Sequence, residues 1–139
     1  MRSKAPLVLI EQAVMLLVFA LAAALCLKAF VWADTQSVQC AARDRAMLAA
    51  QNAAETLKYC EGDFEQAARI GGGMCDNERW IILYDEDWNV TGEEHAYSLH
   101  AIPVKSGLDL LGQAVVVVYQ GELELAALEV CWQEVVGHG

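Results

Sequence analysis

The feature that most constrains this 139-residue chain is an apolar run near its start, residues 6–32, with the sequence PLVLIEQAVMLLVFALAAALCLKAFVW. Only Glu11, Gln12 and Lys28 interrupt it. A helix needs about 20 predominantly apolar residues to cross the hydrocarbon core of a bilayer, because lipid offers the backbone no hydrogen-bond partner and a helix pairs its own backbone groups. The run is long enough, so the sequence predicts a transmembrane helix over residues 7–33.

The charges that flank this run indicate how the chain is oriented. Arg2 and Lys4 lie in a basic leader, residues 1–6, whereas the chain from Asp34 onward carries 18 acidic and six basic side chains, a formal charge of −12. The positive-inside rule therefore places the N-terminus in the cytoplasm and the acidic part outside it. So acidic a surface repels nucleic acid, and we expect the lipid bilayer, and no nucleic acid, as a partner.

Three fates of the apolar run are compatible with the sequence. Its length favours a single-pass anchor that is retained in the membrane. A secretory signal cleaved after Ala33 would instead release a soluble domain, although Lys28 interrupts the run close to that point. A lipoprotein signal ending at Cys26 has Leu25 where a small residue is required.

The helix is predicted to continue beyond the membrane as an amphipathic segment, residues 34–61. No glycine or proline occurs between Leu7 and Glu61, and apolar residues recur at steps of three and four. The alanine-rich stripe permits close approach of a sheet or of a neighbouring helix; it equally suits a helix with high intrinsic propensity and no partner outside its own domain. The stripe consists of Val38, Ala41, Ala42, Ala46, Ala49, Ala53 and Leu57.

The rest of the chain, residues 62–139, predicts a short helix followed by strands. The helix covers residues 63–70, with Asp63 as its cap and three glycines after it. With residues 34–61 this region is long enough for one extracytoplasmic domain. We expect an α+β fold, in which an antiparallel sheet of about four strands packs on the long helix. The strand-forming segments are residues 79–84, 96–104, 113–119 and 127–133.

Four cysteines follow the apolar run, which itself contains Cys26. An even number in an exported domain suggests disulfides, and four unpaired small apolar residues are the alternative. The favoured bridge joins Cys60 to Cys75, since closing a loop of about 15 residues would contribute about 3 kcal/mol. Cys40 lies about 30 Å along the helix from Cys60, beyond the ~7 Å limit for bridged Cα atoms, which leaves Cys40 with Cys131.

An acidic segment, Asp85, Asp87 and Asn89, begins like a calcium-binding loop. An EF-hand also needs glycine at the sixth position and glutamate at the twelfth, where this chain has Val90 and Ala96. The segment therefore predicts a hairpin connection with exposed acids.

The histidines give no support for catalysis or metal binding. His95, His100 and His138 lack metal-ligand spacing with the cysteines. Ser98 lies two residues before His100, but no acid that could orient the imidazole is evident. We expect no catalytic residue, no metal site and no cofactor.

The start of the helix, Leu7-Val8-Leu9-Ile10-Glu11, resembles the mature N-terminus of type IV pilins and type II secretion pseudopilins. Those chains begin with an aromatic or apolar residue and carry a glutamate at the fifth position, and Glu11 is fifth when Leu7 is first. The resemblance covers the architecture of the whole chain but only about five residues of motif. One departure is specific: the family's prepilin peptidase cuts after glycine, or sometimes alanine, and this chain has Pro6 there. Proline also suits the first turn of an uncleaved helix.

The resemblance implies a noncatalytic structural subunit that assembles with homologous subunits through its N-terminal helix. In such assemblies the glutamate, here Glu11, pairs within the membrane with the freed N-terminal amine of a neighbour. A desolvated carboxylate requires an opposite charge. Alternatively, Glu11 snorkels to the cytoplasmic interface beside Arg2 and Lys4. The rival functions are a membrane-anchored extracytoplasmic binding module and a secreted domain cleaved after Ala33.

Overall fold

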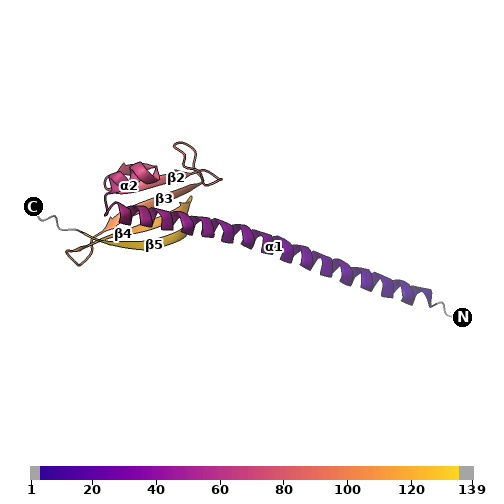
Figure 1. The fold of residues 1–139 in the computed structure, drawn as a ribbon. Coiled ribbons are helices and arrows are strands. Elements are labelled where there is room, and N and C mark those ends of the chain that lie inside the picture. Colours follow the sequence, from indigo (N-terminus) through magenta and orange to yellow (C-terminus); the bar gives the residue numbers. More distant parts are fainter. Residues whose placement is uncertain (1–3, 135–139) are drawn as a thin grey trace, which may run out of the picture. The chain divides into compact units, whose positions relative to one another are not determined.

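The structure is a computed structural model that describes residues 4–134, so the first part of the predicted leader and the last five residues of the predicted domain lie outside the described residues. The chain divides into two compact units, residues 1–40 and residues 41–139. Each unit is described by itself below. Figure 1 shows the order of the elements along the chain.

A single helix, α1 (Ala5–Tyr59), spans 55 residues and contains the whole apolar run. Pro6 lies in its first turn, where a residue without an N–H group removes no helical hydrogen bond. In the first unit every described side chain of the helix is exposed. An 18-residue window of α1 has a mean hydropathy of 2.6, and none of it is buried. Within residues 4–134 this is the one helix long and apolar enough to cross a membrane, and it is compatible with single-pass anchoring.

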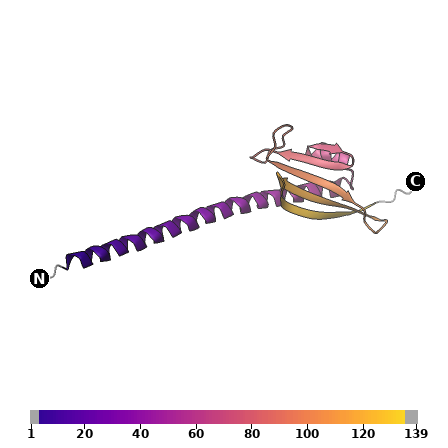
Figure 2. The ribbon, with the colours of Figure 1, turned by 180° about the vertical axis from the view of Figure 1, so that it is seen from behind.

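The second unit has an antiparallel sheet in which each strand pairs with the next, in the order β1-β2-β3-β4-β5 (Figure 2). The predicted α+β class is confirmed, and the four predicted strands correspond to β2 to β5. The short edge strand β1 was not predicted. The elements after α1 are α2 (Phe64–Gly71), β1 (Met74–Asp76), β2 (Arg79–Tyr84), β3 (Tyr97–Val104), β4 (Leu111–Gln120) and β5 (Leu123–Gln133).

Helix α2 begins and ends as its sequence predicts. Asp63 is the N-cap, and its carboxylate accepts a hydrogen bond from the backbone N–H of Gln66 at 3.0 Å. The chain leaves the helix through Gly72 and Gly73, which have φ values of 81° and 85°. A Cβ atom on Gly73 would collide with the carbonyl oxygen of Ile81. Glycine is therefore required where the chain turns from α2 into the sheet.

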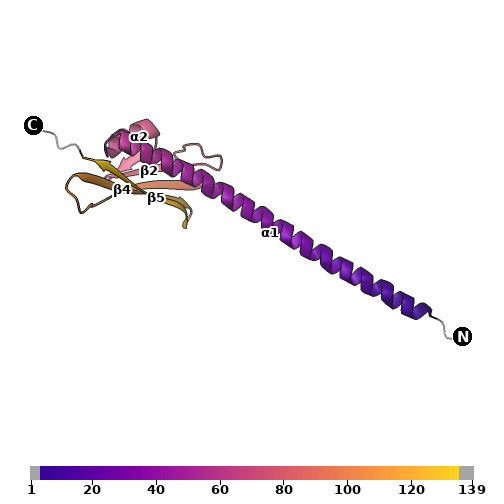
Figure 3. The same ribbon diagram turned by 60° about the horizontal axis from the view of Figure 1, so that its bottom comes forward.

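One face of the sheet packs on the last turns of α1, as Figure 3 shows for the second unit. The predicted apolar stripe of α1 is buried only in part: Ala46 and Ala53 are buried, but Val38 is 64% exposed. Two further alanines, Ala50 and Ala54, are buried as well. These small side chains belong to one buried cluster with residues of the strands. The largest fully buried side chains are Trp80, Leu57, Leu99, Val116 and Val118.

Candidate functional site

Glu11 projects from the exposed part of α1, about a turn and a half after the helix begins. Its neighbours on the helix surface are apolar and exposed, among them Leu7, Ile10 and Met15. Among residues 4–134 the only ion pair is formed by Lys58 and Glu55, so Glu11 has no charged partner within the described chain. An opposite charge for this carboxylate would come from the basic leader, as in the snorkelling alternative, or from another molecule.

The predicted processing point, between Pro6 and Leu7, lies in the first turn of α1. Both side chains are exposed. The backbone is already helical here, since the N–H of Val8 donates to the carbonyl of Lys4 at 3.3 Å. Processing at this bond stays a prediction.

All five cysteines are free thiols, and residues 4–134 contain no disulfide. Cys60 is buried directly after the last residue of α1, and Cys75 lies half-buried on the edge strand β1. Burial, and secondarily the charge of Asp63, raise the pKa of the Cys60 thiol. Cys40 and Cys131 are exposed and belong to different units. The Cys60–Cys75 and Cys40–Cys131 bridges are not formed in this structure and stay predictions.

The acidic segment forms the start of the long connection between β2 and β3, as predicted. One carboxylate oxygen of Asp85 accepts hydrogen bonds from the backbone N–H groups of Asp87 and Asn89, both at 2.9 Å. The other accepts one from the side-chain amide of Asn89 at 3.3 Å. Hydrogen bonding, led by the Asn89 backbone N–H, lowers the pKa of Asp85. Asp85 thus stabilises the turn in which it lies. Within the described residues no cluster of three or more His, Cys, Asp or Glu side chains could hold a metal ion.

Trp88, near the start of this connection, packs against tyrosines of the two strands that it joins. Trp88, with φ of 64°, stacks on Tyr97 with ring centroids 4.1 Å apart and lies 5.6 Å from the ring of Tyr84. This packing holds the strained turn against the sheet. Its structural role accounts for a tryptophan that the sequence alone placed only in a turn.

Ser98 and His100 do meet on β3: the imidazole Nε2 and the hydroxyl Oγ are 3.2 Å apart. The imidazole also lies edge-on to Tyr119, with centroids 5.8 Å apart. Partial burial lowers the pKa of His100, with smaller contributions from the nearby charges of Arg79 and His95. No carboxylate in residues 4–134 bonds to this imidazole, so the pair lacks the third group that orients a catalytic base.

A groove that the sequence did not suggest is formed entirely within the second unit. It has a volume of about 740 Å³ and lies between the start of α2, the connection from β3 to β4, and the end of β5. Trp132 forms part of its lining and contacts the ring of Phe64 edge-on at a centroid distance of 6.4 Å. The indole lies so close to Gly62 and Gly112 that a Cβ atom on either would collide with it. In the sequence, these two glycines are the local feature that corresponds to the packing site of the Trp132 indole.

Comparison with known protein families, with curated proteins and with solved structures found no match to this chain. The geometry of Glu11 and of the groove therefore carries the functional argument.

Proposed function

We propose that this protein is a noncatalytic, pilin-like or pseudopilin-like structural subunit of a membrane-anchored filament or secretion assembly. The observation that carries the proposal is the composition of α1. The apolar run in α1, residues 6–32, presents an exposed surface with one carboxylate, Glu11, and the last turns of α1 supply the alanine-rich face that builds the core of the sheet domain. One helix thus serves both as anchor and as the spine of a folded head.

The energetics of Glu11 favour a partner in the membrane. A carboxylate at the centre of a transmembrane helix costs roughly 2.5 to 3.5 kcal/mol on insertion scales, and less towards the interface. An amine freed by cleavage before Leu7 of a neighbouring subunit would offset that cost, because a desolvated ion pair replaces an isolated charge. In this proposal the N-terminus is cytoplasmic, the sheet domain is extracytoplasmic, and homologous subunits meet along their α1 helices.

The test combines two variants with chemical crosslinking in intact membranes. Glu11→Gln keeps the size of the side chain and removes its charge, so crosslinked oligomers should fall to a small fraction of the wild-type amount. Asp34→Asn removes one charge at the other end of the exposed apolar stretch and should leave them unchanged. Equal crosslinking of Glu11→Gln and wild type would contradict the proposal.

Mass spectrometry of the mature N-terminus gives an independent check. The proposal expects a start at Leu7. A start at Asp34 would indicate a secreted domain cleaved after Ala33, and an intact Met1 would leave an uncleaved anchor.

The groove next to Trp132 favours a second candidate, a membrane-anchored extracytoplasmic binding module. In that case α1 is an anchor alone, and Glu11 snorkels to the interface. Monomers that retain a ligand after extraction, and that never associate in the membrane, would support this candidate over assembly.

A further inference from the structure

The groove has an apolar floor that is open to solvent. Phe64 and Trp132 meet at one side, and Val104 at the end of β3, Leu108 in the following connection and Leu111 at the start of β4 add further apolar side chains. Leu108 is 64% exposed, and Val104 and Leu111 are each about two-fifths exposed. Apolar area left in water forgoes roughly 25 cal/mol per Å², so a ligand that covers these side chains gains that free energy.

The groove also has a rim of predominantly negative charge. Its lining includes five carboxylates and a single ammonium group, and Asp63 alone of the acids serves a helix cap. None of them forms an ion pair within residues 4–134. A cleft lined by one sign of charge concentrates the electrostatic potential and attracts the opposite charge. The charged lining residues are Asp63, Glu65, Glu78, Asp109, Glu134 and Lys105.

We propose that this groove binds a segment of a partner protein in which lysine or arginine side chains alternate with apolar ones. The cations complement the carboxylates of the rim. The apolar side chains cover Leu108 and its neighbours. A volume of about 740 Å³ accommodates a few side chains, within the range of roughly 300 to 1,000 Å³ found for ligand sites.

Other occupants fit the two features less well. An acidic segment is repelled by the rim, and a simple metal cation leaves the apolar floor uncovered. A second copy of this sheet domain carries the same excess of acidic groups and lacks the complementary charge. The combination of floor and rim therefore selects a cationic and apolar segment. This inference goes beyond the proposed function, because it does not depend on whether α1 assembles in the membrane.

The experiment titrates the full-length protein in phosphatidylcholine nanodiscs with short synthetic peptides, measured by calorimetry against empty nanodiscs. A peptide that alternates lysine and leucine should bind and should weaken as sodium chloride is raised. A glutamate–leucine peptide and a lysine–glycine peptide should not bind. Equal binding of the lysine–glycine peptide would show attraction by charge alone and overturn the proposal, as would no binding at all.

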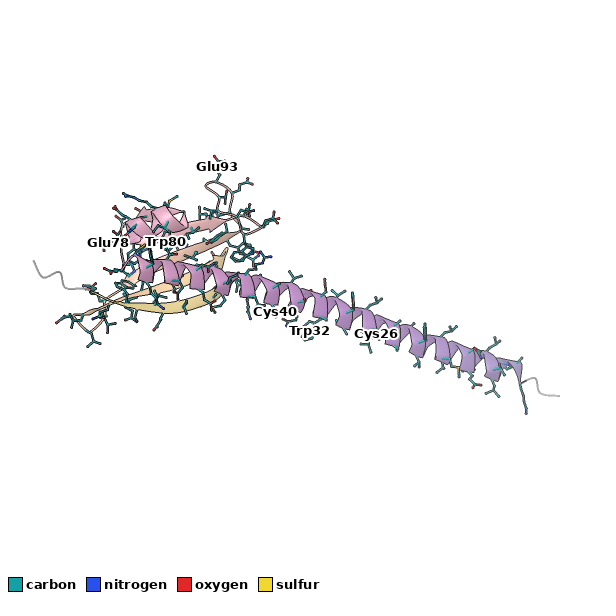
Figure 4. The ribbon with its side chains drawn as sticks, in the orientation of Figure 1. Cys26, Trp32, Cys40, Glu78, Trp80 and Glu93 are labelled. Atoms are coloured by element: carbon teal, nitrogen blue, oxygen red, sulfur yellow. The ribbon has the colours of Figure 1, made fainter. Side chains whose placement is uncertain are left out.

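Matched variants locate the binding. The double variant Glu65→Gln, Asp109→Asn should weaken binding by about twofold to thirtyfold, the effect of losing two exposed charge pairs. Glu93→Gln, Glu94→Gln removes the same charge from the connection between β2 and β3, outside the groove lining, and should leave binding unchanged. Figure 4 labels Glu93 on that connection and Glu78, one of the groove-lining residues, between β1 and β2. Equal weakening by both double variants would refute a specific site.

The apolar floor has its own pair of variants. Leu108→Ser should weaken binding, whereas Leu123→Ser, which alters a comparably exposed leucine outside the groove, should not. Glu11→Gln should bind the peptide like wild type. Failure of the assembly proposal therefore leaves this inference standing, and failure of peptide binding leaves assembly untouched.

Discussion

Replacing Leu57 by alanine tests whether the last turns of α1 are the core of the sheet domain. Leu57 is fully buried in one cluster with Trp80, Leu99 and Val116. The substitution removes three carbon atoms, a transfer term of about 2.4 kcal/mol at 0.8 kcal/mol for each. The neighbouring helix positions are Ala53 and Ala54, whose side chains are too short to fill the space, so a cavity term adds to the loss.

We therefore expect Leu57→Ala to lower the free energy of unfolding of the sheet domain by about 3 to 4 kcal/mol, more than a hundredfold in the folding equilibrium constant. Urea titration of the protein in a non-denaturing detergent, followed by tryptophan fluorescence, measures this value, since Trp80 reports on the same core. The slope of the transition with denaturant should stay constant, which shows that the same surface unfolds.

The matched control is Leu48→Ala in the same helix. Leu48 is 56% exposed, and alanine has at least as high a helix propensity as leucine, so its unfolding free energy should change by less than about 0.5 kcal/mol. A loss below about 1 kcal/mol for Leu57→Ala, or equal losses for both variants, would refute the assignment of this helix face to the core.

Two smaller perturbations test local features of the same domain. Asp63→Ala removes the cap hydrogen bond to Gln66 and should cost about 1 kcal/mol in the same urea titration, whereas Asp63→Ser should recover most of it. His100 has a lowered pKa because folding partly buries it beside Arg79 and His95, so the unfolded chain binds its proton more readily. The free energy of unfolding is therefore highest, as far as His100 contributes, above the ordinary pKa of 6.5, and it declines as the pH falls below that value. His100→Gln should remove this part of the pH dependence. An unchanged dependence of the unfolding free energy on pH in the variant would contradict this assignment.

The elements with strong local signals were predictable from the sequence. The absence of glycine and proline between Leu7 and Glu61 indicates α1, the cap at Asp63 and the glycines after residue 70 indicate α2, and β-forming residues indicate the four longer strands. Strand β1 has only three residues, and Cys75 alone among them is partly buried, so no alternation marks it. Its existence depends on pairing with Arg79–Ile81 of β2, which is a tertiary property.

The start of the buried face of α1 was not predictable either. The stripe of apolar residues begins at Val38, but burial begins only where the sheet covers the helix, near Ala46. The groove was missed for a similar reason. Its lining comes from segments as distant in sequence as Gly62 and Glu134, and no single segment carries a binding pattern. Glu11 is proposed from its position in the apolar run alone, and its role stays a prediction.

The position of β5 after the other strands of the sheet has a consequence for biogenesis. Its side chains Ala126 and Val130 complete the core that begins with the alanines of α1, and its Trp132 lies against Gly62, just after the end of α1. When the chain is exported in the orientation proposed above, α1 crosses or enters the membrane first, and β5 emerges after the other four strands. The alanine face then stays incompletely covered until β5 has been translocated, so the domain completes its folding only after that strand is exported, and a chain truncated before β5 would leave part of that face open to chaperones and proteases.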